Sequence, residues 1–145
     1  MMKIQSAELL EYGIFKNNQP STEQEVDENS PSGYFLWTDE LVLELQTNRI
    51  LIREGMRVGI KYILHGRKPG KMVSYTCRIQ HPEMISPLNQ QPYTEILDHR
   101  HEPLGEELFD FFEFDDEDIP VARGEWIFQI LEKERVLLEQ RFELR

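Results

Sequence analysis

The chain has 145 residues, of which 39% are hydrophobic and 30% charged, and its formal net charge is −11. This length suits one domain, and the apolar content is too high for a wholly disordered protein. The negative charge argues against a general nucleic-acid binder, and no apolar run approaches the about 18 residues of a membrane-spanning helix. A lone cysteine, Cys77, cannot form an internal disulfide, so we expect a cytoplasmic protein in a reducing compartment.

The N-terminal quarter combines a short ordered element with a polar segment. Apolar residues alternate with others over part of 6–15, and this element precedes a stretch of very different composition. Residues 17–33 contain four acidic residues and two prolines but a single aliphatic side chain. Burial of so few apolar groups cannot offset the conformational entropy lost when the segment is ordered. We therefore predict one domain, 1–145, in which 17–33 is a flexible acidic loop.

The clearest periodicity in the sequence lies between Ile50 and Leu64. Every even position there is apolar except Glu54, and alternation of this kind is typical of strands with one buried face. The exception predicts a turn or bulge at Glu54 and Gly55. In 41–45 the three leucines occupy odd positions instead, so another turn or bulge must lie near Thr47 and Asn48.

Three further strands follow in the sequence. Residues 72–80 alternate clearly, 93–101 and 107–114 less so, and the loop 66–70 has the glycines and proline of a hairpin connection. We expect the step from His81 to Pro82 to end the first of these strands.

Two structures are open for the C-terminal segment 126–144. Its helix-forming residues and a stripe of apolar side chains fit an amphipathic helix. The same residues also alternate on either side of 132–135, which fits a β-hairpin whose turn is charged and lacks glycine.

Several short motifs resemble those of a bacterial family of small domains to which no function is assigned. They are the run Gly55–Tyr62, the His81-Pro82 step, and the ending Gly124–Ile130 followed by Val136-Leu137 and Phe142. The charged residues 132–135 depart from that family, which has a glycine-containing turn there. The ending also resembles the last two strands of immunoglobulin-like sandwiches. The resemblance implies a C-terminal hairpin and no activity. We therefore predict an all-β, immunoglobulin-like β-sandwich of about seven or eight antiparallel strands.

Two groups of residues suggest a metal site. In a strand, His99 and His101 would face the same way and could supply two ligands. No recognised metal motif accompanies them, but a small metal-dependent hydrolase using His99, His101 and nearby carboxylates is the alternative function. The acidic stretch 106–118 lacks the alternating ligands and central glycine of a calcium loop, so we predict a solvated turn.

Nucleophilic and cofactor chemistry find little support in the sequence. Cys77 shares the apolar parity of its strand, which predicts a buried, inert thiol. The serines lie in no nucleophile elbow, and no glycine-rich phosphate loop is present. We therefore expect no cofactor and a non-enzymatic protein.

Positive charge is concentrated between Arg49 and Arg78, where eight basic residues accompany one acidic residue. If the alternation holds, four of them share one sheet face: Arg49, Arg53, Arg57 and Lys61. They are the candidate partner-binding residues, although pairing with the chain's own acidic strands is favoured. The function predicted from the sequence is a binding or protein-interaction module, monomeric or homodimeric, with an unknown protein partner.

Overall fold

The computed structural model describes residues 3–17, 25–26, 34–35 and 41–145, and every regular element in them is a β-strand. In chain order the strands are β1 (Ser6–Asn17), β2 (Glu25–Val26), β3 (Tyr34–Phe35), β4 (Leu41–Leu45), β5 (Arg49–Ile50), β6 (Arg57–His65), β7 (Met72–Ile85), β8 (Pro92–Pro103), β9 (Glu107–Glu113), β10 (Gly124–Glu132) and β11 (Arg135–Leu144).

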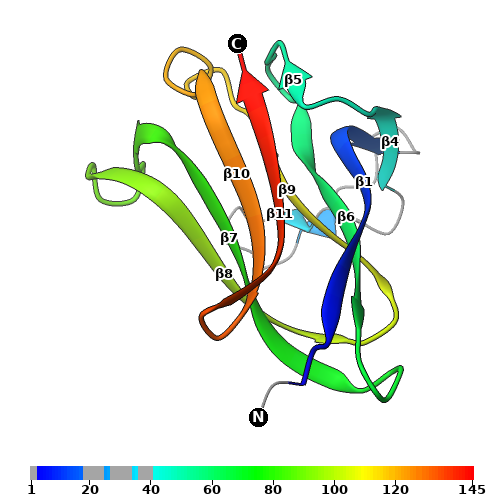
Figure 1. The fold of residues 1–145 in the computed structure, drawn as a ribbon. Coiled ribbons are helices and arrows are strands. Elements are labelled where there is room, and N and C mark those ends of the chain that lie inside the picture. The colour runs from blue at the N-terminus through cyan, green and yellow to red at the C-terminus, as the bar shows by residue number, and fades with distance from the viewer. Residues whose placement is uncertain (1–2, 18–24, 27–33, 36–40) are drawn as a thin grey trace.

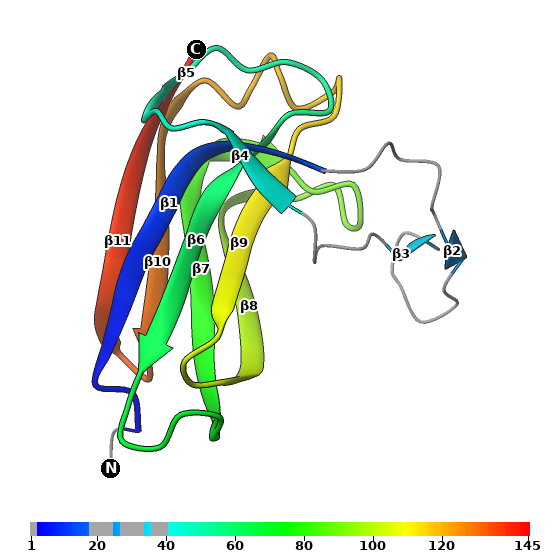
Figure 2. The ribbon, with the colours of Figure 1, turned by 90° about the vertical axis from the view of Figure 1, so that its right-hand side faces the viewer.

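Two sheets pack face to face and form a sandwich (Figures 1 and 2). One sheet has the strand order β4-β1-β6-β9, and the other has the order β5-β11-β10-β7-β8. This confirms the predicted all-β sandwich. β2 and β3 pair with each other, and the remainder of the predicted flexible loop 17–33 lies outside the described residues, apart from Asn17 at the end of β1.

One strand pair departs from the antiparallel prediction. β5 pairs parallel with β11, through Arg49 with Glu143 and Ile50 with Leu144. The chain leaves the four-stranded sheet after β4 and joins the edge of the five-stranded sheet at β5. The shift in the alternation of apolar residues near Thr47 and Asn48 therefore marks the point where the chain passes from one sheet to the other. This passage makes β5 run parallel to β11.

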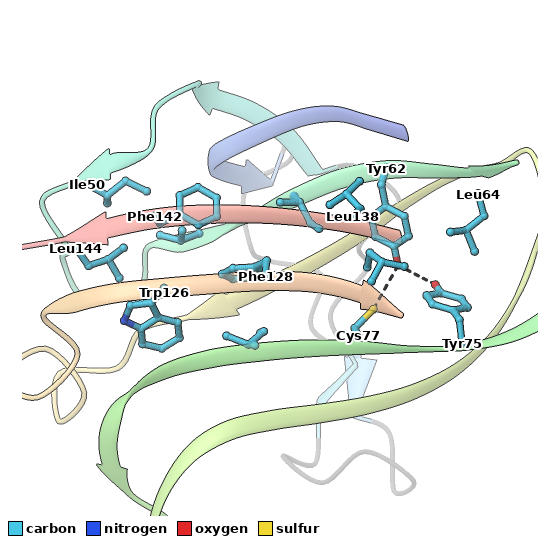
Figure 3. Close-up of a cluster of buried hydrophobic side chains, with 14 of the residues drawn as sticks. Ile50, Tyr62, Leu64, Tyr75, Cys77, Trp126, Phe128, Leu138, Phe142 and Leu144 are labelled. Carbon is cyan, nitrogen blue, oxygen red and sulfur yellow. Dashed lines mark hydrogen bonds between the residues drawn. The ribbon is translucent and has the colours of Figure 1, made fainter. Parts of the chain in front are cut away.

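The alternation in β6 produces the core, as the sequence predicts. Val58, Ile60, Tyr62 and Leu64 are at most 1% exposed and face the other sheet. There they meet the β10 side chains Trp126, Phe128 and Ile130, which are fully buried (Figure 3). Full burial of one such aliphatic side chain stabilises the fold by roughly 1.5–3 kcal/mol.

The C-terminal segment is a β-hairpin, so the helical alternative is wrong. β10 and β11 pair antiparallel along their whole length, from Gly124 with Leu144 to Glu132 with Arg135. Lys133 in the turn has φ 56°, in the left-handed region that glycine or asparagine normally occupies. The turn forms without glycine because the long, buried ladder behind it offsets this local strain.

The prediction that His81 and Pro82 end a strand is wrong, because β7 continues to Ile85. The register between β7 and β8 shifts between Gln80 and Met84, and β10 pairs with β7 only as far as Gln80. Pro82 therefore sits at an irregularity where the ladder is interrupted. A proline, which cannot donate a backbone hydrogen bond, is tolerated at such a position.

β1 lies between β4 and β6, and Gly13 permits this close packing. Its φ is +133°, and a Cβ atom at this position would lie 2.2 Å from the Leu45 carbonyl oxygen. A side chain here would push β4 away from β1.

Candidate functional site

A groove lies at one end of the five-stranded sheet because its strands end at different levels. β10 pairs with β7 as far as Leu131 with Thr76, whereas β7 begins earlier, at Met72. The first residues of β7 are therefore flanked by β8 but not by β10. The space left beside them is about 630 Å³.

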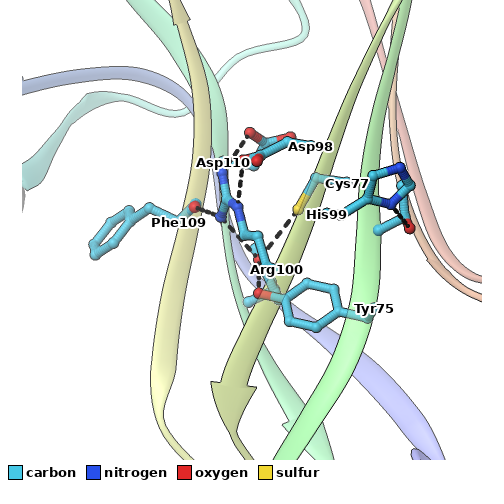
Figure 4. Close-up of polar contacts among 9 residues, drawn as sticks. Tyr75, Cys77, Asp98, His99, Arg100, Phe109 and Asp110 are labelled. Carbon is cyan, nitrogen blue, oxygen red and sulfur yellow. Dashed lines mark hydrogen bonds and ion pairs between the residues drawn. The ribbon is translucent and has the colours of Figure 1, made fainter. Parts of the chain in front are cut away.

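Two hydroxyl groups and two imidazoles form the floor and one wall of this groove. Ser74 and Thr76 of β7 lie opposite His101 and His99 of β8 in the strand register. The Thr76 hydroxyl is 2.8 Å from His99 Nδ1, and the Ser74 hydroxyl is 3.0 Å from His101 Nδ1. These hydrogen bonds fix both rings through Nδ1. Figure 4 shows His99 on the outer side of the sheet, opposite the side of Arg100.

The other wall comes from the start of the chain and the β10–β11 turn. The Glu132 carboxylate is buried and accepts hydrogen bonds from the backbone N–H groups of Lys3, at 2.9 Å, and Ile4, at 3.1 Å. Arg135 Nη2 lies 3.4 Å from the same carboxylate. The charge of Glu132 is thus already balanced. In the part of the chain that the structure describes, Lys3 and Lys133 line the groove without an ion-pair partner.

A second polar cluster lies between the two sheets, on the opposite side of β8. Arg100 donates hydrogen bonds to Asp98 at 2.6 Å, to Asp110 at 3.1 Å and to the backbone carbonyl of Phe109 (Figure 4). It therefore joins β8 to β9, which are edge strands of different sheets. Inward-facing charges on edge strands discourage pairing with other chains. We assign this cluster a structural role.

Asp110 is the most deeply buried carboxylate of this cluster, at 4% exposure. Burial raises its pKa to about 6, and the neighbouring Arg100 opposes that rise. Oδ1 accepts the bond from Arg100, while buried Oδ2 has no hydrogen-bond partner among the described residues.

Cys77 is buried, as the alternation predicts, and points into the core. Burial raises the pKa of its thiol to about 12. The Tyr62 hydroxyl lies 3.5 Å from its sulfur and 2.7 Å from the Tyr75 hydroxyl, and burial raises the pKa of both phenols. Such a thiol stays protonated near neutral pH and is a poor nucleophile.

The four basic residues selected from the sequence do not share a sheet face, so that expectation is wrong. Arg49 lies in β5 of the five-stranded sheet, whereas Arg57 and Lys61 lie in β6 of the four-stranded sheet. Arg53 is exposed in the connection between them. The phase of the alternation continues through this connection even though the chain changes sheets there.

Three of these four side chains pair with acidic residues of neighbouring strands, which is the pairing that the sequence favours. The ion pairs are Arg57–Glu113 at 3.2 Å, Lys61–Glu11 at 3.3 Å, Lys61–Glu107 at 3.2 Å and Arg49–Glu143 at 4.0 Å. A docking role for these residues stays a prediction.

His99 and His101 do face the same way, as expected for alternate residues of a strand. However, the described residues contain no cluster of three or more histidine, cysteine, aspartate or glutamate side chains able to hold a metal ion. Asp98, the acid beside them in sequence, is exposed and pairs with Arg100 on the other face of β8. The metal-dependent hydrolase therefore gains no support from this arrangement.

The acidic stretch 106–118 is dispersed rather than gathered around one point. Asp110 faces the interior, Glu113 pairs with Arg57, and the Asp118 carboxylate accepts a 2.9 Å hydrogen bond from the backbone N–H of Asp115. The last contact closes a turn, as the sequence predicts for this segment.

The architecture and the groove define a two-sheet β-sandwich protein with a polar surface site. A crystal structure of an immunoglobulin-like protein from Pseudomonas aeruginosa is similar, with a TM-score of 0.64, 21% sequence identity and 96% of each chain covered. No family model matches the chain, and no curated protein does. The immunoglobulin-like fold predicted from the sequence is therefore confirmed, and similarity at this level of identity concerns the fold alone. None of the described residues form a helix that could cross a membrane.

Proposed function

We propose that this domain is a non-enzymatic binding module and that it recognises its partner through the groove beside His99 and His101. The observation that carries the proposal is the construction of this groove. Its volume of about 630 Å³ lies within the range of about 300–1,000 Å³ that is usual for ligand sites. Its polar groups are held in place by hydrogen bonds between adjacent strands.

The state of the reactive side chains supports a binding rather than a catalytic role. The Cys77 thiol is buried and protonated, and the buried charges of Arg100 and Asp110 are engaged with each other. These groups stabilise the sandwich, and the side chains of Cys77 and Arg100 lie on the face of the sheet opposite Ser74 and Thr76, although Arg100 also borders the groove.

Several predictions from the sequence accompany this proposal. They are the cytoplasmic location, the monomeric or homodimeric state, and membership of the bacterial family of small domains. The protein partner predicted from the sequence stays a prediction, and it is the alternative to a small ligand in the groove. Docking through Arg49, Arg53, Arg57 and Lys61 is a competing binding mode. The ion pairs of three of these residues argue against it.

A variant that fills the groove tests the proposal. The full chain and Ser74→Tyr would be incubated with soluble cell extract, re-purified, and analysed by native mass spectrometry for bound molecules. Gln80→Tyr is the matched control, because Gln80 lies on the same strand and the same outer face, six positions along β7. We expect the wild type and the control to retain a ligand that Ser74→Tyr loses, with unchanged circular dichroism for all three.

Two results would contradict the proposal. Equal retention by Ser74→Tyr would place binding elsewhere, for example on the basic residues of β5 and β6. Conversion of the bound molecule on incubation would show that the domain is an enzyme.

A further inference from the structure

We propose that the groove binds a small ligand that carries a phosphate group, held between Lys3 and Lys133 on one wall and His99 and His101 on the other. The inference rests on the proposed function and names the chemical class of the ligand.

The first step of the argument concerns charge. A chain of net charge −11 repels anions, so an anion can bind only where positive charge is locally unbalanced. The groove meets this condition, because Glu132 is neutralised by Arg135 and two backbone N–H groups while Lys3 and Lys133 are not paired within the described residues.

Among the described residues, a second depression of similar size lacks unpaired positive charge. A depression of about 720 Å³ beside β9 is lined by three glutamates, with Lys61 and Arg100 as its basic residues. Both basic residues there are already ion-paired, Lys61 with Glu11 and Glu107 and Arg100 with aspartates. That depression disfavours an anion. Of the two, we therefore expect an anion to bind in the groove at the end of β10.

The second step concerns hydrogen bonding. Ammonium and imidazole N–H groups and hydroxyls are donors that suit the oxygen atoms of a phosphate, and charged donors make the stronger bonds. In the tautomer in which the hydroxyls of Ser74 and Thr76 donate to Nδ1, the imidazoles of His101 and His99 carry their N–H on Nε2 and can donate it to a ligand. The two lysines also argue against a divalent cation at the imidazole pair, because like charges repel.

The third step concerns size. A phosphate group alone would leave most of a space of about 630 Å³ empty, whereas a small organic phosphate would fill much of it. Met72 also lines the groove and offers an apolar contact for the organic part of such a ligand.

Titration of the full chain with pyrophosphate, followed by ¹H–¹⁵N NMR, tests the proposal. We expect saturable shifts of the backbone amides of 72–76, 99–101 and 132–133. The double variant Lys3→Gln/Lys133→Gln should weaken binding at least about tenfold. The control Lys16→Gln/Arg123→Gln removes the same charge from exposed positions outside the groove, and its affinity should stay within about twofold.

The ligand class is wrong if pyrophosphate shows no saturation by about 10 mM, or if both double variants weaken binding equally. An equal affinity for sulfate and pyrophosphate would also overturn it, since it would show that the groove binds anions without preference for phosphate. These failures are distinct from failure of the proposed function. If the wild type still retains an uncharged molecule that Ser74→Tyr loses, the groove is a binding site and only the phosphate assignment is refuted.

Discussion

Replacement of Arg100 by methionine should destabilise the sandwich strongly and in a pH-dependent way. The side chain of Arg100 is 22% exposed, and its partner Asp110 is 4% exposed as a residue. Removal of one partner from a buried ion pair leaves an uncompensated charge and costs about 3–5 kcal/mol. We expect a loss of this size at pH 8. At this pH, Asp110 in the variant either carries a buried charge without a partner or has to hold a proton well above its ordinary pKa, and both states cost free energy.

The pH dependence follows from the pKa of Asp110. Burial raises it from 3.8 to about 6, so the folded state binds more protons than the unfolded state between these values. The stabilising contribution of this carboxyl is complete below its ordinary pKa and is lost as the pH rises through about 6, at about 1.4 kcal/mol per pKa unit. Without Arg100, which lowers this pKa, the group should titrate at still higher pH. The loss caused by Arg100→Met should therefore be smaller at pH 5 than at pH 8.

Guanidinium unfolding followed by tryptophan fluorescence at pH 5 and pH 8 measures both effects. Adding Asp110→Asn to Arg100→Met removes the buried charge, so the double variant should be more stable than Arg100→Met alone at pH 8. A loss below about 1 kcal/mol at pH 8, or the same loss at both pH values, would refute the reasoning.

Three further predictions concern other residues. Burial lowers the pKa of His81, so the unfolded state binds the proton of this imidazole more readily, and stability should fall as the pH drops through 6.5. The melting temperature of His81→Phe should therefore decrease less between pH 7.5 and pH 5.5 than that of the wild type. Cys77 should resist iodoacetamide in the native protein and react fully in guanidinium, as mass spectrometry would reveal, whereas rapid native labelling would show that the thiol is accessible. Arg57→Gln should cost at most about 1 kcal/mol at low salt and less at high salt, whereas Arg53→Gln should leave unfolding unchanged; loss of a protein partner without loss of stability would favour docking through these residues.

The sequence predicted the strands that contribute most of the core, and the physical reason is simple. A strand with one face against another sheet must place an apolar residue at every second position, and this period is visible in Val58–Leu64 and Val73–Ile79. The buried state of Cys77 followed from the same period. The C-terminal hairpin needed the resemblance as well, because its residues also suit a helix.

Local patterns failed where several strands contribute to one feature. Pro82 was expected to end β7, but an irregularity in the pairing with β8 accommodates it. Arg49, Arg53, Arg57 and Lys61 keep one parity in the sequence, yet the chain changes sheets between them. A period of two records which face of a strand is buried, and it carries no information about the sheet to which that strand belongs.

The sequence by itself determined that the central part of the chain forms strands, which faces of these strands are buried, and that its only thiol is inert, since burial of apolar surface leaves a periodic trace. The sandwich and its C-terminal hairpin were predicted with the help of the resemblance. The tertiary structure alone decided that Arg100 meets Asp110 across the two sheets, and that the pairing of β10 with β7 stops at Thr76, four residues after β7 begins. It thereby placed Lys3 and Lys133 opposite His99 and His101. Contacts of this kind join residues far apart in the chain, so they depend on how whole strands are arranged and have no periodic trace in the sequence.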